Sequence, residues 1–457
     1  MGAKLPAISV AQELAGKIAA LKAAALPAAV RRKCEDLILD VAGLCVTARN
    51  EDYVKSALAA CGDDGPCTAI GHARTLTAAD AAFVNGTAAH GEDFDDTFEG
   101  GPVHAGAVIV PAVLAACERH GRNGASALVG IAVGSEVMCR LSTVMPTAVH
   151  KAGFHPTAVF GAVGAAAGVG AALGLNAKQM VDALGVAASM AGGIIEYLAE
   201  GAWTKRMHAG WAAQSGLRAA LLGQAGFTGP RTVFEGVHGL FNGFAHSTQG
   251  DYAALTGDFG RRWVIETLAF KPYPCGTMAH PYIDCARQLA ARGIKPGDVK
   301  EIMCEVAEGT VHRLWEPLAA KQRPPNGYAA KFSTPFLLAT GFVRGGVGLD
   351  AFYETAIKDA AVLVLAAKVK YVVDPANPYP REFTGHIRAT LNDGSTVEER
   401  QPHLRGGAHE PLTREDIEDK FRLNVRHGGW SAAQGEGALA LLGKLYDGKI
   451  ELKGLRG

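Results

Sequence analysis

The chain has 457 residues, and its 45 Lys plus Arg residues balance its 45 Asp plus Glu residues. Nucleic acids and anionic membranes attract basic protein surfaces, so this balance argues against both as partners. The hydrophobic share of 48% and the charged share of 20% are typical of a globular protein. At roughly 100–200 residues per domain, the length predicts two to four domains, or one large domain with a smaller one.

The cysteines and the N-terminus bear on the cellular compartment. The nine cysteines are odd in number and irregularly spaced, and no two form a CxxC pair, so free thiols in a reducing compartment are expected. The N-terminal region lacks the uninterrupted apolar core of a signal peptide. The most membrane-like run, residues 158–175, is rich in alanine and glycine and only weakly hydrophobic. These features predict a cytoplasmic protein without a membrane partner.

Over the first half of the chain, apolar residues recur mostly at helical spacing. The clearest helical segments cover residues 10–22, 28–48 and 126–140. Capping patterns precede two further segments, with Thr77 three residues ahead of Asp80 and Asn176 three residues ahead of Gln179. This half of the chain is therefore expected to be all-helical.

The glycine-rich run 161–176 contains Gly168 and Gly170, which are spaced as in part of a dinucleotide-binding loop. No strand is expected ahead of it, and the glycines continue at three- and four-residue spacing through a helical pattern. Close packing between helices is the better explanation. No nicotinamide or flavin site is expected.

Segments rich in β-branched residues appear from about residue 263. We expect strands at 263–265, 300–306, 369–373 and 386–391, with helices at 278–292 and 335–341. From Thr413, where Asp416 completes another capping pattern, the chain is helical again. The pattern predicts a mainly α protein in which residues 1–265 and 401–457 form a large all-α domain. Residues 266–400 are expected to form a smaller inserted α+β domain, which the family resemblance described below implies is a lid.

The segment 90–104 concentrates groups that can move protons. It holds four acids within five residues, Glu92, Asp93, Asp95 and Asp96. Neighbouring carboxylates raise one another's pKa, which suits acid–base catalysis or cation binding. The spacing is not that of a calcium loop, so no metal site is expected. The plain alternative is a solvated acidic loop, although Phe94 and Phe98 among the acids argue against a simple surface run.

Two later segments supply imidazole and ammonium groups. His155 stands at an expected helix start, where free backbone N–H groups favour an anion, and the alternative is an exposed capping loop. Lys205 and His208 lie in a basic cluster between Trp203 and Trp211. A basic cluster in an apolar frame is costly without an anion to neutralise it.

A last segment, 270–280, lies at the expected domain boundary and contains Lys271 and His280. Small-molecule pockets tend to form at such boundaries. None of these segments is specific alone. Together they supply lysines and histidines to hold carboxylates, and acids and imidazoles to transfer protons.

In this order, the segments resemble the MmgE/PrpD family. The most specific stretches are AAFVNGTAAHGEDFDDT (81–97), WTKRMHAGWAA (203–213) and FKPYPCGTMAHP (270–281), supported by LDVAGLCVTA (39–48) and HEPLTREDIEDKF (409–421). The resemblance implies a large all-α domain with a smaller α+β lid, a homodimer, and no metal or organic cofactor. The family includes 2-methylcitrate dehydratases, cis-aconitate decarboxylases and iminodisuccinate epimerases, which all handle a proton beside a carboxylate.

The resemblance also assigns residues. The family's catalytic positions match Asp93, Thr97, His104, His155, Lys205 and Lys271. We expect Thr97 to bind substrate together with His208 and His280, and the other five to be catalytic. Two positions depart from the decarboxylase pattern: Gly276 replaces an expected histidine, and Phe336 replaces an active-site tyrosine whose hydroxyl it lacks. Both departures weigh against decarboxylation.

The leading hypothesis is a cofactor-independent lyase that dehydrates a 2-methylcitrate-like hydroxy acid. Lys205 and Lys271 would neutralise substrate carboxylates, while Asp93, His104 and His155 would share the roles of base and acid. The alternative is an epimerase of an iminodisuccinate-like dicarboxylate. A cis-aconitate-type decarboxylase and a non-catalytic helical binding protein are less favoured. The expected partners are a small di- or tricarboxylate and a second copy of the chain.

Overall fold

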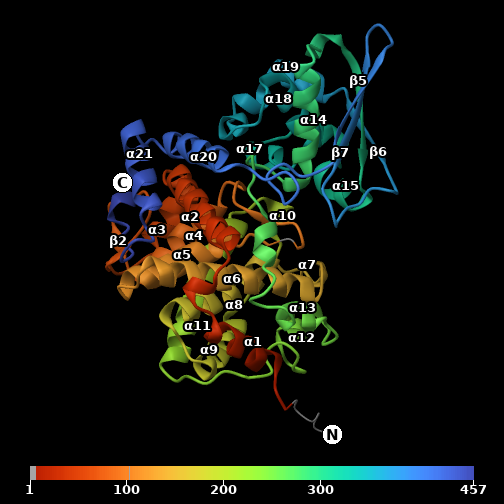
Figure 1. Ribbon diagram of the computed structural model, residues 1–457. Coiled ribbons are helices and arrows are strands. Elements are labelled where there is room, and N and C mark those ends of the chain that lie inside the picture. The colour runs from red at the N-terminus through yellow and green to blue at the C-terminus, as the bar shows by residue number, and fades with distance from the viewer. Residues whose placement is uncertain (1–6, 102) are drawn as a thin grey trace. The chain divides into compact units, whose positions relative to one another are not determined.

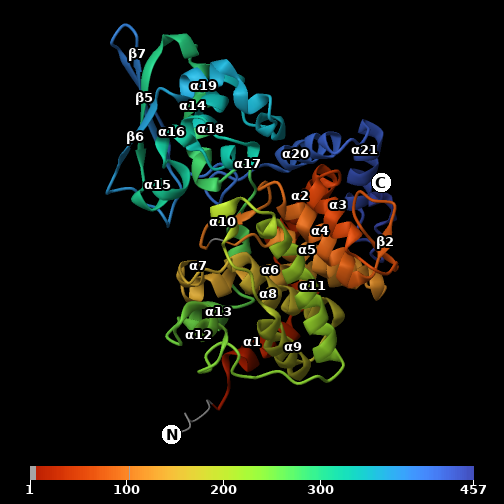
Figure 2. The same cartoon turned by 180° about the vertical axis from the view of Figure 1, so that it is seen from behind.

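The structure is a computed structural model that describes residues 7–101 and 103–457. Its internal contacts divide the chain into two compact units. Unit 1 comprises residues 1–91, 95–268 and 413–457, and unit 2 comprises residues 92–94 and 269–412 (Figures 1 and 2). The protein is mainly α with a small sheet, at 57% helix and 9% strand.

Unit 1 is built from helices. They are α1 (Val10–Ala20), α2 (Ala28–Ala48), α3 (Asp52–Ala59), α4 (Ala78–His90), α5 (Gly106–Arg119), α6 (Gly124–Val144), α7 (Ala148–Lys151), α8 (Pro156–Leu173), α9 (Ala177–Met190), α10 (Tyr197–Glu200), α11 (Thr204–Gln224), α12 (Leu240–Ala245), α13 (Tyr252–Thr256), α20 (Arg414–His427) and α21 (Ala432–Gly443). Short strands β1 (Cys67–Thr68) and β2 (Thr75–Leu76) pair antiparallel, and β3 (Thr97–Phe98) follows α4. At the centre, α8 packs against α5, α6, α9 and α11. The helices predicted at 10–22, 28–48 and 126–140 are confirmed as α1, α2 and α6.

The predicted capping residues begin their helices as expected. The Thr77 hydroxyl accepts the Asp80 N–H at the start of α4. Asn176 and Gln179 form a reciprocal capping box at α9, and Thr413 forms one with Asp416 at α20. These side chains satisfy N–H groups that the first turn of a helix leaves without partners.

The glycine-rich run is a helix, as predicted, and its glycines allow α6 and α8 to meet backbone to backbone. A Cβ on Gly168 would lie 2.7 Å from the Gly130 carbonyl oxygen, and a Cβ on Gly164 would lie 2.9 Å from the Gly134 oxygen. Both helices are long and apolar enough to cross a membrane, but 94% of each apolar window is buried within the fold. They are therefore explained as core helices of unit 1.

Unit 2 contains a four-stranded sheet in the order β6-β5-β7-β8. Its strands are β5 (Val299–Val306), β6 (Val369–Val373), β7 (Gly385–Leu391) and β8 (Thr396–Gln401), of which only β5 and β6 run parallel. Its helices are α14 (His280–Ala291), α15 (Glu308–Leu314), α16 (Leu318–Gln322), α17 (Gly327–Ala330), α18 (Thr334–Arg344) and α19 (Ala360–Ala366). Both views place α14, α18 and α19 on the same side of the sheet (Figures 1 and 2). A continuous apolar core fills the space between them.

The predicted strand at 263–265 is wrong, because Val264–Thr267 forms a 3-10 helix. Its first two N–H groups, on Val264 and Ile265, donate to the buried Glu136 carboxylate, so a side chain takes the place of a partner strand. Strand β8 was not predicted, because its sequence TVEERQ is polar and mostly exposed, as is common at a sheet edge.

The main segment of unit 2 extends from Ala269 to Leu412, whereas the predicted limits were residues 266 and 400. The segment after β8 stays in this unit through a hydrogen bond from Phe270 N to Gly406 O and an ion pair of Arg405 with Asp284. The spacing of apolar residues does not reveal polar contacts of this kind, so it could not predict this boundary.

Candidate active site

Four histidines of unit 1 gather into one cluster. His90 ends α4, His104 precedes α5, His155 is the N-cap of α8, and His208 lies in the second turn of α11. The ring centroids are 5.0 Å apart for His90 and His104, 5.6 Å for His90 and His155, and 5.3 Å for His155 and His208. All four side chains are largely buried.

Glycines let the supporting helices approach closely enough to bring these rings together. A Cβ on Gly86 of α4 would lie 2.8 Å from the Gly210 Cα of α11. His90 is one helical turn beyond Gly86, and His208 is two residues before Gly210. Packing of small residues therefore positions two of the four imidazoles.

His155 and His208 are joined directly. Their Nδ1 atoms are 3.2 Å apart, within hydrogen-bonding distance. Burial lowers the pKa of His155 well below its usual range, and the charges of His90, His208, Lys205 and His104 lower it further. Burial, then His90 and Lys205, lower the pKa of His208 to about 4. Both rings are therefore neutral at pH 7.

A loop and an aromatic ring hold this pair in place. The His155 N–H donates to the Gly193 carbonyl at 2.8 Å, and Phe154 pairs with Ile194 in an antiparallel bridge. Gly193 has φ +119°, and a Cβ there would lie 2.7 Å from the Ala158 Cβ and 3.3 Å from the His208 ring, so only glycine fits. The Tyr197 ring meets both imidazoles edge-on, at 5.9 and 5.8 Å.

The other two histidines are oriented by the acidic segment. His90 Nδ1 donates to the buried Asp95 carboxylate at 2.7 Å. His104 Nδ1 lies 2.7 Å from the Asp96 carbonyl oxygen and 3.3 Å from the Thr97 hydroxyl. Since a carbonyl can only accept, the proton of neutral His104 is on Nδ1 and the lone pair is on Nε2. His104 is thus held in the tautomer of a base.

Ligand atoms of His90, Asp95 and His104 lie within 4.8 Å of one another, so these residues could hold a metal ion. His90 Nδ1 is hydrogen-bonded to Asp95 and His104 Nδ1 to a carbonyl oxygen. The buried His90 Nε2 atom has no hydrogen-bond partner among the described residues, so an ion bound through the Nε2 atoms would leave both bonds in place. That the reaction uses no metal stays an expectation from the family resemblance, and it is tested below.

Asp96 forms hydrogen bonds with the backbone at the start of α5. Its carboxylate accepts the N–H groups of Ala105 at 3.0 Å and Gly106 at 2.8 Å. Burial raises the pKa of Asp96 to about 8, assisted by the charges of Asp95 and Asp40. The four acids thus do not form a solvated surface loop, since Asp93, Asp95 and Asp96 are all buried.

Lys205, in the first turn of α11, is 8% exposed, and its charge helps to lower the pKa of both His155 and His208. The tryptophans on either side of the basic cluster, Trp203 and Trp211, are themselves 50% and 48% exposed. Its helix, α11, packs against α4 and α8.

Three predicted site residues belong to unit 2. The buried Lys271 ammonium donates to the Asp93 carbonyl oxygen at 2.9 Å, and Asp93 has a left-handed φ of +54°. Nearby, Lys331 binds both the carboxylate and the carbonyl oxygen of Glu92, at 2.8 and 2.7 Å. Two lysines therefore anchor the strained start of the acidic segment. The remaining predicted site residue of unit 2, His280, is fully buried at the start of α14, and its Nε2 atom lies 3.3 Å from the Cys275 carbonyl oxygen.

The structure bears differently on the two positions, Phe336 and Gly276, at which the sequence departs from the decarboxylase pattern. Phe336 is 1% exposed and belongs to the apolar core of unit 2. Its lack of a hydroxyl is therefore explained by packing and says little about the reaction. Gly276 donates its N–H to the Lys331 carbonyl oxygen, and a Cβ there would lie 3.3 Å from the Phe332 ring. No imidazole is present at that position.

Within unit 1 the structure brings Thr97 and His104 together, and Lys205 acts electrostatically on His155 and His208. Within unit 2 it joins Asp93 to Lys271. Sequence reasoning missed His90, Asp95 and Tyr197 as members of the cluster. His90 and Asp95 lie inside the motif at 81–97, but their hydrogen bond depends on a sharp turn after α4 that the spacing did not reveal.

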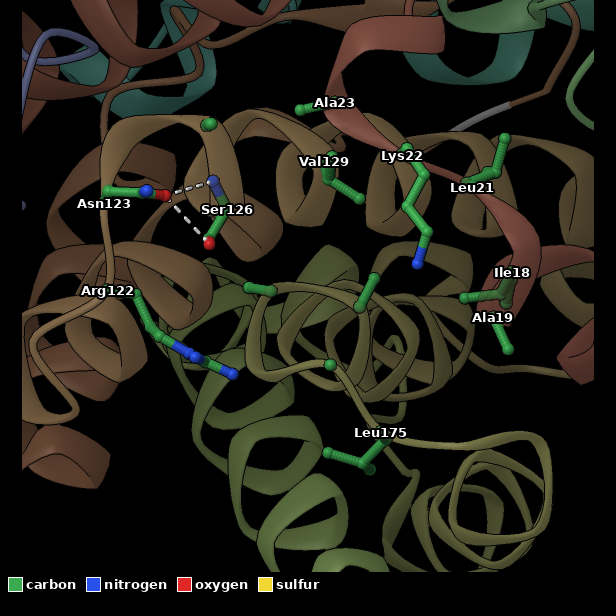
Figure 3. Close-up of a pocket in the computed structure, with 14 residues that line it drawn as sticks. Ile18, Ala19, Leu21, Lys22, Ala23, Arg122, Asn123, Ser126, Val129 and Leu175 are labelled. Carbon is green, nitrogen blue, oxygen red and sulfur yellow. Dashed lines mark hydrogen bonds between the residues drawn. The ribbon is translucent and has the colours of Figure 1, made fainter.

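A separate cavity of about 340 Å³ lies among α1, the start of α6 and the end of α8 (Figure 3). Lys22 and Arg122 line it beside apolar residues such as Val129 and Leu175. Arg122 already donates to the Leu173 carbonyl oxygen, and Asn123 caps α6 by accepting from Ser126. The cavity lacks the paired proton carriers of the histidine cluster.

Comparison with known proteins connects this geometry to a family. The MmgE/PrpD N-terminal domain model matches residues 12–253, and the C-terminal domain model matches residues 273–439. The chain is 31% identical to the cis-aconitate decarboxylase of Homo sapiens over 364 residues, which is 76% of this chain and 72% of that protein.

Two fungal proteins match a larger share of the chain. Identity is 28% over 441 residues with the cis-aconitate decarboxylase-like protein oryM of Aspergillus oryzae, covering 91% of this chain and 90% of that protein. It is 27% over 429 residues with the cis-aconitate decarboxylase of Aspergillus terreus, covering 87% and 85%. With both domain models matched along most of its length, the chain belongs to the MmgE/PrpD family.

Proposed function

We propose that the protein is a cofactor-independent lyase that transfers a proton at a carbon atom beside a carboxylate of a small di- or tricarboxylate. The observation that carries the proposal is the His155–His208 pair, two neutral imidazoles hydrogen-bonded in a buried site. A neutral imidazole can accept a proton at one nitrogen and donate one from the other. The pair therefore offers both a base and an acid at pH 7.

Removing a proton beside a carboxylate builds charge on a group that is already negative. A buried cation can stabilise that charge in place, and Lys205 is close enough to the pair to shift its pKa values. In a site shielded from water such a contact is stronger than at a surface. Lys205 supports the proposal that the substrate is an anion.

We favour dehydration of a 2-methylcitrate-like hydroxy acid as the specific reaction. Elimination of water takes one proton from carbon and returns one to the leaving hydroxyl, so it needs the base and the acid that the histidine pair offers. Decarboxylation of cis-aconitate needs a proton delivered to carbon and no base. The names of the relatives favour decarboxylation, and the missing imidazole at Gly276 weighs against it. The alternative is an epimerase of an iminodisuccinate-type dicarboxylate, which needs a proton carrier on each face of the reacting carbon atom.

A substrate panel in D₂O separates these reactions. The purified protein is incubated with 2-methylcitrate, citrate, cis-aconitate and an iminodisuccinate-type dicarboxylate, and the products are followed by NMR and ultraviolet absorbance. A new conjugated alkene with loss of water supports dehydration, itaconate with release of CO₂ supports decarboxylation, and deuterium with an inverted centre supports epimerisation. If no acid is converted or bound, the lyase proposal fails and the result favours a non-catalytic helical protein.

Independence from metal is tested in the same assay. After dialysis against EDTA we expect unchanged turnover, because the proposed proton transfer between His155 and His208 uses no metal ion. Loss of activity that only a divalent ion restores would contradict this. Millimolar Zn²⁺ is the companion measurement, since an ion held by His90, Asp95 and His104 would add a positive charge beside the histidine pair and should inhibit turnover.

For the location and assembly of the protein, we propose a cytoplasmic homodimer. All nine cysteines are free and buried, which is compatible with a reducing compartment.

A further inference from the structure

The hydrogen bond between His155 and His208 has an unusual consequence, because it joins the same atom of each ring. Both contribute Nδ1, at 3.2 Å. Two bare nitrogen atoms would repel, and two N–H groups would clash, so one proton lies between them. Exactly one ring donates, therefore, and the other accepts.

This single proton determines what each ring offers at Nε2. A neutral imidazole has one protonated nitrogen and one lone pair. The ring that donates from Nδ1 has its lone pair at Nε2 and can act as a base. The ring that accepts at Nδ1 carries its proton at Nε2 and can act as an acid. Neither Nε2 atom has a hydrogen-bond partner among the described residues.

We propose that His155 and His208 work as one proton-transfer unit, in which uptake of a proton at one Nε2 drives release of a proton at the other through the bridging Nδ1–H. This inference rests on the proposed function and adds a role to His208, which the sequence placed only in substrate binding. When the donor ring takes the substrate's carbon-bound proton at Nε2, its Nδ1 proton passes to the other ring. That ring then gives its Nε2 proton to the leaving hydroxyl.

The step conserves protons and charge. The substrate loses one proton and one hydroxide, which leaves as water, and the electron pair of the C–H bond forms the alkene. The histidine pair gains one proton and loses one, so it ends neutral with the two tautomers exchanged. No oxidant, reductant or cofactor is needed. Exchange with water or a further rearrangement of the bridging proton restores the first tautomer.

The surroundings of the pair favour this behaviour over an ordinary hydrogen bond. His90 has a buried carboxylate, Asp95, to stabilise a proton, whereas no carboxylate contacts His155 or His208 among the described residues. Instead Lys205 and His90 oppose a lasting positive charge on the pair. A proton taken up at one ring is therefore expected to be passed on quickly.

The first test uses the resting protein. Selective ¹⁵N-histidine NMR at pH 7 should show one ring of the pair protonated at Nδ1 and the other at Nε2, assigned with His155→Asn and His208→Asn. Two rings both protonated at Nε2, with no proton between them, would overturn the proposal whatever the substrate is.

The second test measures coupling during turnover. On the acid that the wild-type protein converts, each single asparagine variant should lower kcat by ~10²-fold or more, and the double variant should be no slower than the worse single one. His208→Asn keeps a hydrogen-bonding group near Nδ1 but cannot relay a proton, so it should still exchange the substrate's α-proton in D₂O if His155 is the base. The exposed His120→Asn is the matched control and should keep wild-type kinetics.

A proton inventory in H₂O–D₂O mixtures completes the design. A curved plot, indicating two protons in motion, is expected for the wild type, and a linear plot for His208→Asn. If the two single variants multiply in the double variant, the histidines act independently and the coupling fails while the lyase proposal stands. If the wild type converts no acid at all, the proposed function fails and the relay fails with it.

Discussion

Lys205 is the residue whose substitution tests the anion-binding role most directly. Its ammonium is buried in unit 1 and acts on two imidazoles whose pKa values it lowers. A cation in that position raises the free energy of a protonated histidine and lowers that of a bound carboxylate. The same charge thus keeps the histidine pair neutral and attracts the substrate.

We predict that Lys205→Ala lowers kcat/KM by ~10²-fold or more, because the developing negative charge loses a nearby cation. Lys205→Arg should restore activity only in part, since the guanidinium is planar and larger. The matched control is Arg218→Ala, which removes an exposed cation from the same helix. The measurement is kcat/KM of each variant on the acid that the wild type converts, with circular dichroism to verify folding. Wild-type kinetics in Lys205→Ala would remove the basis for the anion site.

Asp96 makes a prediction about stability against pH. In the folded protein its pKa is raised to about 8, from a usual value near 3.8. Between these values the folded protein holds a proton that the unfolded chain has released, so the free energy of unfolding falls as pH rises. The lowered pKa values of His155 and His208 act in the opposite direction and only below about 6.5.

In the window from about pH 6.5 to 8 the two histidines no longer oppose Asp96, and comparison with Asp96→Asn removes the contribution of other buried groups with raised pKa values, such as Cys67 and Cys117. Over this window, urea unfolding should show a steeper loss of stability for the wild type than for Asp96→Asn, whose side chain does not ionise and can still accept an N–H group at the start of α5. Parallel curves for the two proteins would show that Asp96 is ionised throughout.

At the scale of elements, local patterns predicted what is local. The capping residues Thr77, Asn176 and Thr413 begin helices where expected, because a cap depends on its own turn alone. The segment at 264–267 was predicted wrongly because the distant Glu136 satisfies its N–H groups. The polar strand β8 gave no hydrophobic pattern to detect.

In the candidate site, too, the sequence predicted local features but not the contacts between distant segments. Motif positions located His104, His155 and His208, yet the Nδ1–Nδ1 hydrogen bond between residues 155 and 208 follows from how α8 and α11 pack. No spacing along the chain encodes it. The identity of the aromatic neighbours was likewise inaccessible, since Tyr197 meets the rings while the tryptophans at 203 and 211 are half exposed.

Helix packing in unit 1 gives a prediction at this scale. Gly168→Val places a branched side chain where even a Cβ would lie 2.7 Å from the Gly130 carbonyl oxygen, so α6 and α8 must separate. We expect a loss of about 3 kcal/mol or more in the free energy of unfolding, as for overpacked cores. Gly437→Val is the control, because a Cβ on this glycine of α21 meets nothing within 4 Å. Equal stability of the two variants would contradict the close-packed interface.

At the scale of the whole molecule, unit 1 carries an unusual set of exposed apolar side chains. Ile194, Leu198, Trp203 and Trp211 are each about half exposed or more, and all come from α10, the start of α11 and the loop before them. Large apolar groups that cluster on a surface mark interaction sites. Together with the family resemblance, they lead us to predict a homodimer in which this segment is buried.

The dimer prediction is tested by mass in solution. A single chain has a mass of 47.5 kDa, and light scattering at micromolar concentration should give twice that value. A symmetric interface presents each substituted residue twice, so Leu198→Glu with Trp211→Glu buries four carboxylates in one dimer and should produce monomers. Val364→Glu, which alters an exposed apolar residue of α19 in unit 2, should leave the dimer intact. A monomeric wild type would refute the assembly, and a dimer that survives the double substitution would place its interface elsewhere.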